Sequence, residues 1–157
     1  TSVFLAGNAD LDALLPAQGV YLDADDALMQ QLLAMREAVS KVLEPMRAEG
    51  RIGAALQADV TVYADGIDVA AMPGLQDELR FLFITSSLAV QPNNSAGSDA
   101  IAVEGTPFKV LANVSKHGKC VRCWHYVESV GQDAHDPELC GRCIENVNGA
   151  GEVRRYF

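Results

Sequence analysis

Hydrophobic residues between positions 23 and 53 recur at the spacing of an α-helix. They step by four and three along the chain and form one apolar stripe: Leu28, Leu32, Met35, Val39, Val42 and Met46. Gly50 and Gly53 end the pattern, and Pro45 is expected to kink or restart the helix because it lacks a backbone donor. Residues 1–22 show no such period. The sequence therefore predicts an irregular lead and an amphipathic helix within residues 1–53.

Residues 54–114 combine strand and helix patterns. Alternating apolar residues predict one strand at 59–64, and 86–92 is a second strand candidate. A helix is predicted between them from one apolar face: Leu75, Leu79, Leu82 and Phe83, after Pro73 and Gly74. Two further alternating runs within 101–114 predict a hairpin with Pro107 on its edge. We expect a small mixed α/β unit whose core is too small to be robust alone.

The only cysteines form two Cys-x-x-Cys pairs separated by sixteen residues: Cys120, Cys123, Cys140 and Cys143. Two intervening residues allow a tight turn to aim both sulfurs at one point, and Gly141 suits such a turn because glycine tolerates a positive φ. Two such turns complete the tetrahedral sulfur shell of a zinc ribbon. The sequence thus predicts an α+β protein in three parts: 1–53, 54–114 and a four-cysteine, zinc-ribbon-like module at 115–157.

Other chemistries use the same residues. Iron can occupy the same four sulfurs, two disulfides would need an oxidising compartment, and a redox pair would need only one Cys-x-x-Cys. We expect one structural Zn²⁺, and a closed shell leaves no position for a catalytic water.

The residues beside the cysteines have two interpretations each. Lys119, Arg122 and Arg142 either offset the thiolate charge or contact phosphates. Trp124 either packs on the metal turn or offers a platform for an unstacked RNA base. Three histidines are surplus to four thiolates and are expected to be surface or packing residues: His117, His125 and His135.

Charge and composition exclude several classes of function. The net charge is −9, with 15 acidic and 6 basic residues in 1–113 but 6 of each in 114–157. This balance argues against a free-standing nucleic-acid binder. No catalytic triad, phosphate loop, acidic metal cluster, signal peptide or membrane-spanning apolar run is visible. We expect a non-catalytic cytoplasmic piece, and its start at Thr1 suggests excision or processing.

The segments KCVRCWHY and LCGRCIENVNGAGE resemble the C-terminal end of bacterial isoleucyl-tRNA synthetases. The resemblance extends upstream through REAVSKVLEPMRAEGRIGAALQADVTVYA and DELRFLFITS to SVFL near the start. It covers nearly the whole chain and is most specific around the cysteines and Trp124.

The resemblance implies a role in a larger enzyme. That family joins isoleucine to its tRNA with ATP, using His-Ile-Gly-His and Lys-Met-Ser-Lys-Ser signatures that this chain lacks. The chain resembles the non-catalytic C-terminal piece, which follows the anticodon-binding helices, helps dock the anticodon stem-loop and carries zinc on the four cysteines.

The implied partners are tRNA, bound weakly by the isolated piece, and the rest of the synthetase, in a monomer. The candidate RNA-binding residues are Trp124 and the basic side chains of the neutral C-terminal part: Arg122, Arg142, Lys119, Arg154 and Arg155. The alternative is a stand-alone zinc-ribbon module for protein interaction, which would explain the cysteines but not the upstream resemblance.

Overall fold

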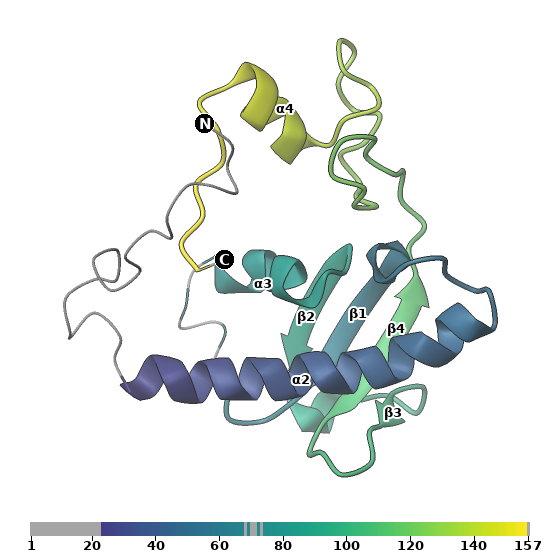
Figure 1. Cartoon of the computed structure of the whole chain (residues 1–157), viewed down its shortest axis with the longest axis vertical. Coiled ribbons are helices and arrows are strands. Elements are labelled where there is room, and N and C mark those ends of the chain that lie inside the picture. Colours follow the sequence, from purple (N-terminus) through teal and green to yellow (C-terminus); the bar gives the residue numbers. More distant parts are fainter. Residues whose placement is uncertain (1–22, 68, 70–71, 73, 157) are drawn as a thin grey trace, which may run out of the picture. The chain divides into compact units, whose positions relative to one another are not determined.

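The computed structural model describes residues 23–67, 69, 72 and 74–156 (Figure 1). The chain divides into two compact units, residues 1–32 and residues 33–157. The predicted irregular lead, 1–22, and Pro73 lie outside the described residues. The predicted α+β fold class is confirmed by the helices and the mixed sheet, followed by a four-cysteine cluster. The division into three parts stays a prediction.

Helix α2 (Asp23–Ala48) carries the predicted stripe. Leu28 is half-buried, and the other five residues of the stripe are buried. In the second unit, Val42 and Met46 line the same groove as Leu111 and Ala112, so residues 33–48 lie against the sheet.

The helix is unbroken at Pro45, so the restart that was one of the two expectations does not occur. Proline deprives the Lys41 carbonyl of its helical partner, and Lys41 is exposed to solvent. The last helical residue is Ala48, and the chain leaves the helix at Gly50, as predicted, with φ 72°. The Gly50 N–H donates to the Arg47 carbonyl at 3.0 Å and the Arg51 N–H to the Met46 carbonyl at 2.9 Å, the pattern of a Schellman cap.

The four-stranded sheet has the order β2-β1-β4-β3. β1 (Ala58–Tyr63) runs parallel to β2 (Ser87–Gln91), and α3 (Leu75–Phe83) connects them. β4 (Lys109–Val114) pairs antiparallel with β1 and with β3 (Ile101–Ala102). The predicted strands, helix and hairpin are therefore present, although β3 has only two residues.

The sheet leads directly into the cysteine module, as we call residues 115–157. The Ser115 N–H donates to the Gln57 carbonyl at 2.8 Å, just beyond the end of β4. Gln57 closes a short 3₁₀ turn (Ala55–Gln57) that precedes β1. The module therefore begins beside the start of β1. Within the residues that the structure describes, its one helix is α4 (Gly141–Asn148).

Candidate metal centre

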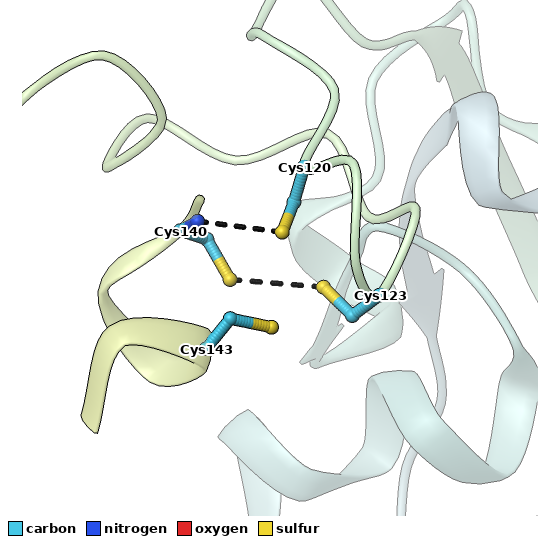
Figure 2. Close-up of side chains that lie close together, drawn as sticks. All are labelled: Cys120, Cys123, Cys140 and Cys143. Carbon is cyan, nitrogen blue, oxygen red and sulfur yellow. Dashed lines mark hydrogen bonds between the residues drawn. The ribbon is translucent and has the colours of Figure 1, made fainter. Parts of the chain in front are cut away.

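Four cysteine side chains from two separate turns converge on one point (Figure 2). Their sulfur atoms all lie within 4.8 Å of one another: Cys120, Cys123, Cys140 and Cys143. All four are free thiols, three of them buried and Cys123 partly exposed. The two predicted pairs are thus positioned to bind a single metal ion.

The first pair lies in a tight turn closed by backbone hydrogen bonds. The Trp124 N–H donates to the Cys120 carbonyl at 2.9 Å, and the Cys120 N–H donates to the His125 carbonyl at 2.9 Å. Trp124 has φ 66°, in the left-handed region that bulky residues rarely adopt. The chain therefore reverses directly after Cys123.

The second pair lies at the start of α4. Cys140 is the residue before the helix, and Cys143 lies in its first turn. The Cys140 N–H donates to the Cys120 sulfur at 3.4 Å, which links the two turns. Gly141 was expected to use a positive φ, and this is wrong: it is the first helical residue. Helical geometry already brings residues three apart to one side.

The sulfur positions fit a zinc ion. Tetrahedral Zn–S bonds of about 2.3 Å place neighbouring sulfurs about 3.8 Å apart. The Cys123 and Cys140 sulfurs are 3.6 Å apart. Val127, Val130 and Leu139 pack around the cluster. Four protein sulfurs would close the shell and make the metal a structural element.

The surroundings of the sulfurs lower the pKa of one cysteine thiol and raise the pKa of two others. Although burial opposes ionisation, backbone N–H groups of Cys123, Cys140 and Arg122 lower the pKa of the Cys120 thiol to about 6. Burial raises the pKa of Cys140 to about 12 and also raises the pKa of Cys143. Four adjacent thiolates therefore require a cation among them.

Two arginines approach these sulfurs. Arg122 Nη1 donates to the Cys143 sulfur at 3.6 Å. Partial burial by itself lowers the pKa of Arg142, but contacts with Cys123 and Glu152 outweigh it and raise that pKa. Both contacts support the interpretation that these cations offset thiolate charge.

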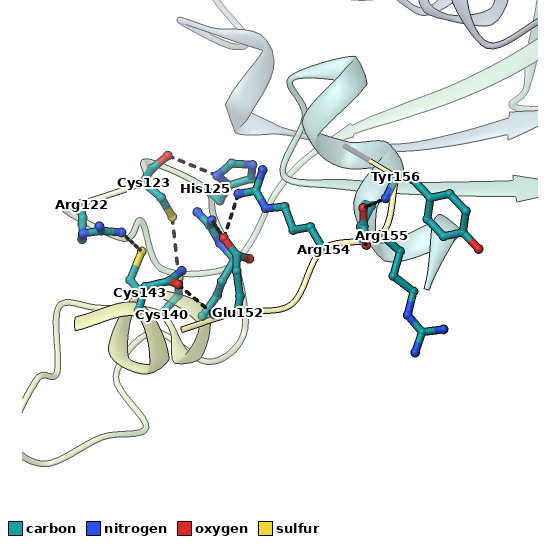
Figure 3. A network of polar contacts seen from close by, with 12 residues as sticks. Arg122, Cys123, His125, Cys140, Cys143, Glu152, Arg154, Arg155 and Tyr156 are labelled. Atoms are coloured by element: carbon teal, nitrogen blue, oxygen red, sulfur yellow. Dashed lines mark hydrogen bonds and ion pairs between the residues drawn. The ribbon is translucent and has the colours of Figure 1, made fainter. Parts of the chain in front are cut away.

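A second polar cluster joins α4 to the end of the chain (Figure 3). Glu152 Oε1 accepts hydrogen bonds from Arg142 and Arg154, each at 2.8 Å. The two guanidinium groups lie 5.0 and 4.1 Å from the centre of the Phe81 ring on α3. Arg142 is only 17% exposed, so this predicted RNA contact is largely engaged within the chain.

Trp124 does not pack on the sulfur cluster. Its side chain is 60% exposed, and the apolar residues around the cysteines come from elsewhere. Lys119 Nζ lies 5.4 Å from the centre of its ring. The packing interpretation of Trp124 is therefore wrong, and an aromatic–cation pair faces solvent beside the metal site.

The three histidines behave as surface or packing residues. His125 Nδ1 lies 3.1 Å from the Cys123 carbonyl oxygen, and its ring meets Phe81 edge-on at 5.6 Å. His117 and His135 are exposed. The candidate metal cluster contains only cysteines among the described residues.

Sequence reasoning missed the residues that attach the cysteine module to the sheet. The Tyr126 N–H donates to Ser86 Oγ at 2.6 Å, and Gln57 Nε2 donates to the Tyr126 hydroxyl at 3.0 Å. Nothing in the local sequence marks Ser86, because its partner lies 40 residues further on.

Glu78 forms the second attachment. Its two carboxylate oxygens accept hydrogen bonds from the backbone N–H groups of Arg155 and Tyr156, each at 2.8 Å. Glu78 is buried on the apolar face of α3 beside Leu75 and Leu79. A carboxylate on the apolar face of a predicted helix could have indicated a hydrogen-bond partner from elsewhere in the chain, since buried charges require partners.

These features define a small zinc-binding unit docked on a mixed sheet. Residues 118–146 match the family model of the zinc finger found in FPG and IleRS. The cysteine module thus carries a zinc finger of that type, and the predicted Zn²⁺ cofactor is confirmed.

Isoleucine–tRNA ligases are among the relatives that match most of the chain. The chain is 50% identical over 145 residues to that of Stenotrophomonas maltophilia (strain K279a), covering 92% of this chain and 14% of the ligase. Identity to the ligase of Xanthomonas campestris pv. campestris (strain B100) is 48% over the same shares. The ligase of Pseudomonas paraeruginosa (strain DSM 24068 / PA7) is 48% identical, covering 86% of this chain and 15% of the ligase.

The predicted resemblance to isoleucyl-tRNA synthetases is therefore confirmed. The chain spans about 14% of the length of the curated relatives it matches. Within the described residues, no helix is both long and apolar enough to cross a membrane.

Proposed function

We propose that this chain is the C-terminal, tRNA-binding region of an isoleucine–tRNA ligase, which attaches isoleucine to its tRNA using ATP. The observation that carries the proposal is the identity of about 50% to such ligases over 92% of the chain. The remaining sequence of the enzyme would supply the nucleotide and amino-acid sites. We expect a cytoplasmic monomer.

The piece itself is non-catalytic in this proposal. A closed sulfur shell offers no coordination site for substrate or water. Its role would be to help dock the anticodon stem-loop once the rest of the enzyme holds the tRNA. Contacts made by an already tethered partner act at high effective concentration, so a few are sufficient.

The exposed aromatic–cation pair is the best-supported RNA contact. The Trp124 indole is 60% exposed and Lys119 lies over it, which suits stacking on a splayed base beside a phosphate. Arg122 and Arg155 are exposed residues that can reach phosphates as well. Arg142 and Arg154, paired with Glu152, would contribute mainly by holding the module in place.

Two measurements test the proposal. The coding sequence upstream of Thr1 should encode several hundred residues with the two catalytic signatures; a start codon at Thr1 would favour the stand-alone interaction module. The 157-residue chain alone should show no isoleucine-dependent ATP–pyrophosphate exchange above a boiled control, whereas the full-length enzyme should show it.

A further inference from the structure

A small pocket gives access to two of the four sulfurs. Cys123 and Cys140 line a pocket of about 100 Å³, and the other two cysteines do not. Because a water molecule occupies about 30 Å³ of liquid, such a pocket admits only a molecule with a few heavy atoms. Cys123 is also the one partly exposed cysteine of the cluster. A small reagent therefore meets Cys123 first.

The same two sulfurs are in contact with each other. They lie 3.6 Å apart although they come from different turns (Figure 2). A disulfide needs a bond of about 2.05 Å, so the two sulfurs must approach each other by about 1.5 Å to join.

Positive charge surrounds this pocket. Arg80 and Arg142 line it together with the two sulfurs. Sulfurs that bind a metal ion do so as thiolates, and nearby cations stabilise an anion that leaves during reaction. A hydroxide ion expelled from a peroxide is such an anion.

We propose that Cys123 and Cys140 are a peroxide-sensitive pair that switches the zinc module. The Cys123 thiolate attacks one oxygen of hydrogen peroxide, the O–O bond breaks, and hydroxide leaves with Cys123 as a sulfenic acid. The Cys140 thiolate then attacks the Cys123 sulfur, forms the disulfide and displaces a second hydroxide. Two thiolates are oxidised by two electrons and one peroxide is reduced to two hydroxides.

The product changes the fold around the site. Only Cys120 and Cys143 remain as thiolates, which cannot complete a tetrahedral sulfur shell, so the ion is released and the module loosens. A dithiol reductant together with zinc restores the original state, because a disulfide is reversible.

Peptide mapping of the zinc-loaded chain tests which sulfurs react. Trypsin cuts after Lys119, Arg122 and Arg142, so Cys123 and Cys140 share peptide 123–142 while the other two cysteines lie in 120–122 and 143–154. After brief treatment with equimolar hydrogen peroxide and blocking of free thiols, we expect peptide 123–142 with an internal disulfide. Its formation should parallel zinc release to a colorimetric chelator. A first disulfide that links 123–142 to either neighbouring peptide would overturn the proposal.

A matched pair of variants tests the pocket. Val127 and Val130 both pack against the cysteines, but only Val127 lines the pocket. Val127→Ala should accelerate peroxide-driven zinc release severalfold relative to Val130→Ala, which removes the same atoms from the same cluster. Equal rates in the two variants would show that access through the pocket does not limit oxidation and would contradict the proposal.

Discussion

The backbone N–H of Tyr126 donates a hydrogen bond to the hydroxyl oxygen of Ser86 at 2.6 Å. Ser86 is fully buried and donates its own proton to the Leu56 carbonyl, so one hydroxyl joins the cysteine module to the connection before β2 and to the segment before β1. The module is thus docked through specific polar contacts and is not simply tethered to β4.

Ser86→Ala should loosen this docking. The change leaves the Tyr126 N–H and the Leu56 carbonyl without their partner, which costs about 1–3 kcal/mol for buried groups. We expect lower stability in denaturant titration and faster amide exchange in residues 118–127. Ser87→Ala is the control, because Ser87 is exposed and its hydroxyl donates to Asp59 at the surface. Equal effects of both changes would argue against a special role for Ser86.

Metal analysis of the chain purified without added metal should find about one Zn²⁺ per chain, since four sulfurs form one closed shell. Iron as the main metal, or four free thiols without metal, would contradict the assignment. Cys140→Ser should release the ion, because the shell loses one of its four sulfurs.

Loss of zinc should unfold the cysteine module before the sheet. Binding free energy of a structural zinc is folding free energy for the segment that supplies its ligands. In Cys140→Ser, amide exchange should rise through 115–157 and less in β1, whose Val60 and Val62 are buried in the apolar core. Exchange that rises equally in both regions would show that the module and the sheet unfold together.

Glu152→Gln should destabilise the end of the chain in a pH-dependent way. Burial by itself raises the pKa of Glu152, but hydrogen bonds from Arg154 and Arg142 outweigh it and lower that pKa from 4.5 to about 2. A lowered folded-state pKa gives stability that is complete above about pH 4.5 and lost as the pH falls toward 2.

The deficit of this variant should therefore be constant from about pH 8 to 5 and shrink below about pH 4.5. Its size is at most about 3 kcal/mol by linkage, and less because the carboxylate is partly solvated. Glu138→Gln, an exposed acid of the same module, is the control in parallel denaturant titrations. A deficit that persists unchanged as the pH falls through this range would exclude the ion pair as its source.

Trp124→Ala in the full-length enzyme should lower aminoacylation and leave adenylate formation intact. Loss of one stacked base weakens tRNA binding by roughly 1–3 kcal/mol, and this affects only the steps that involve tRNA. The control is Val121→Ala, which removes an exposed apolar side chain from the same turn. Equal loss of both activities would indicate a folding role for Trp124, and no loss of either would remove it from the RNA interface.

The sequence by itself indicated α2, α3, the strands and the candidate metal ligands, because each depends on spacing, but it did not indicate α4 at Gly141–Asn148. The apolar stripe of α2, the alternation in β1 and β4 and the two Cys-x-x-Cys pairs are local patterns, and local geometry translates each into one structure. Pro45 shows the limit of such patterns: the helix continues past the proline because the hydrogen bond it loses lies at the solvent-exposed face.

Only the tertiary structure decided which side chains around the metal site contact other residues of the chain and which are exposed to solvent. Arg142 and Arg122 both lie beside a cysteine in the sequence. In the structure Arg142 contacts Glu152 and Phe81, whereas Arg122 is exposed and donates only a long hydrogen bond to the Cys143 sulfur. Trp124 adopts a positive φ in its turn and is 60% exposed, which its residue type alone does not indicate. The partners that dock the module, Ser86 and Glu78, lie 40 and about 77 residues from what they bind, and no local period records contacts over such separations.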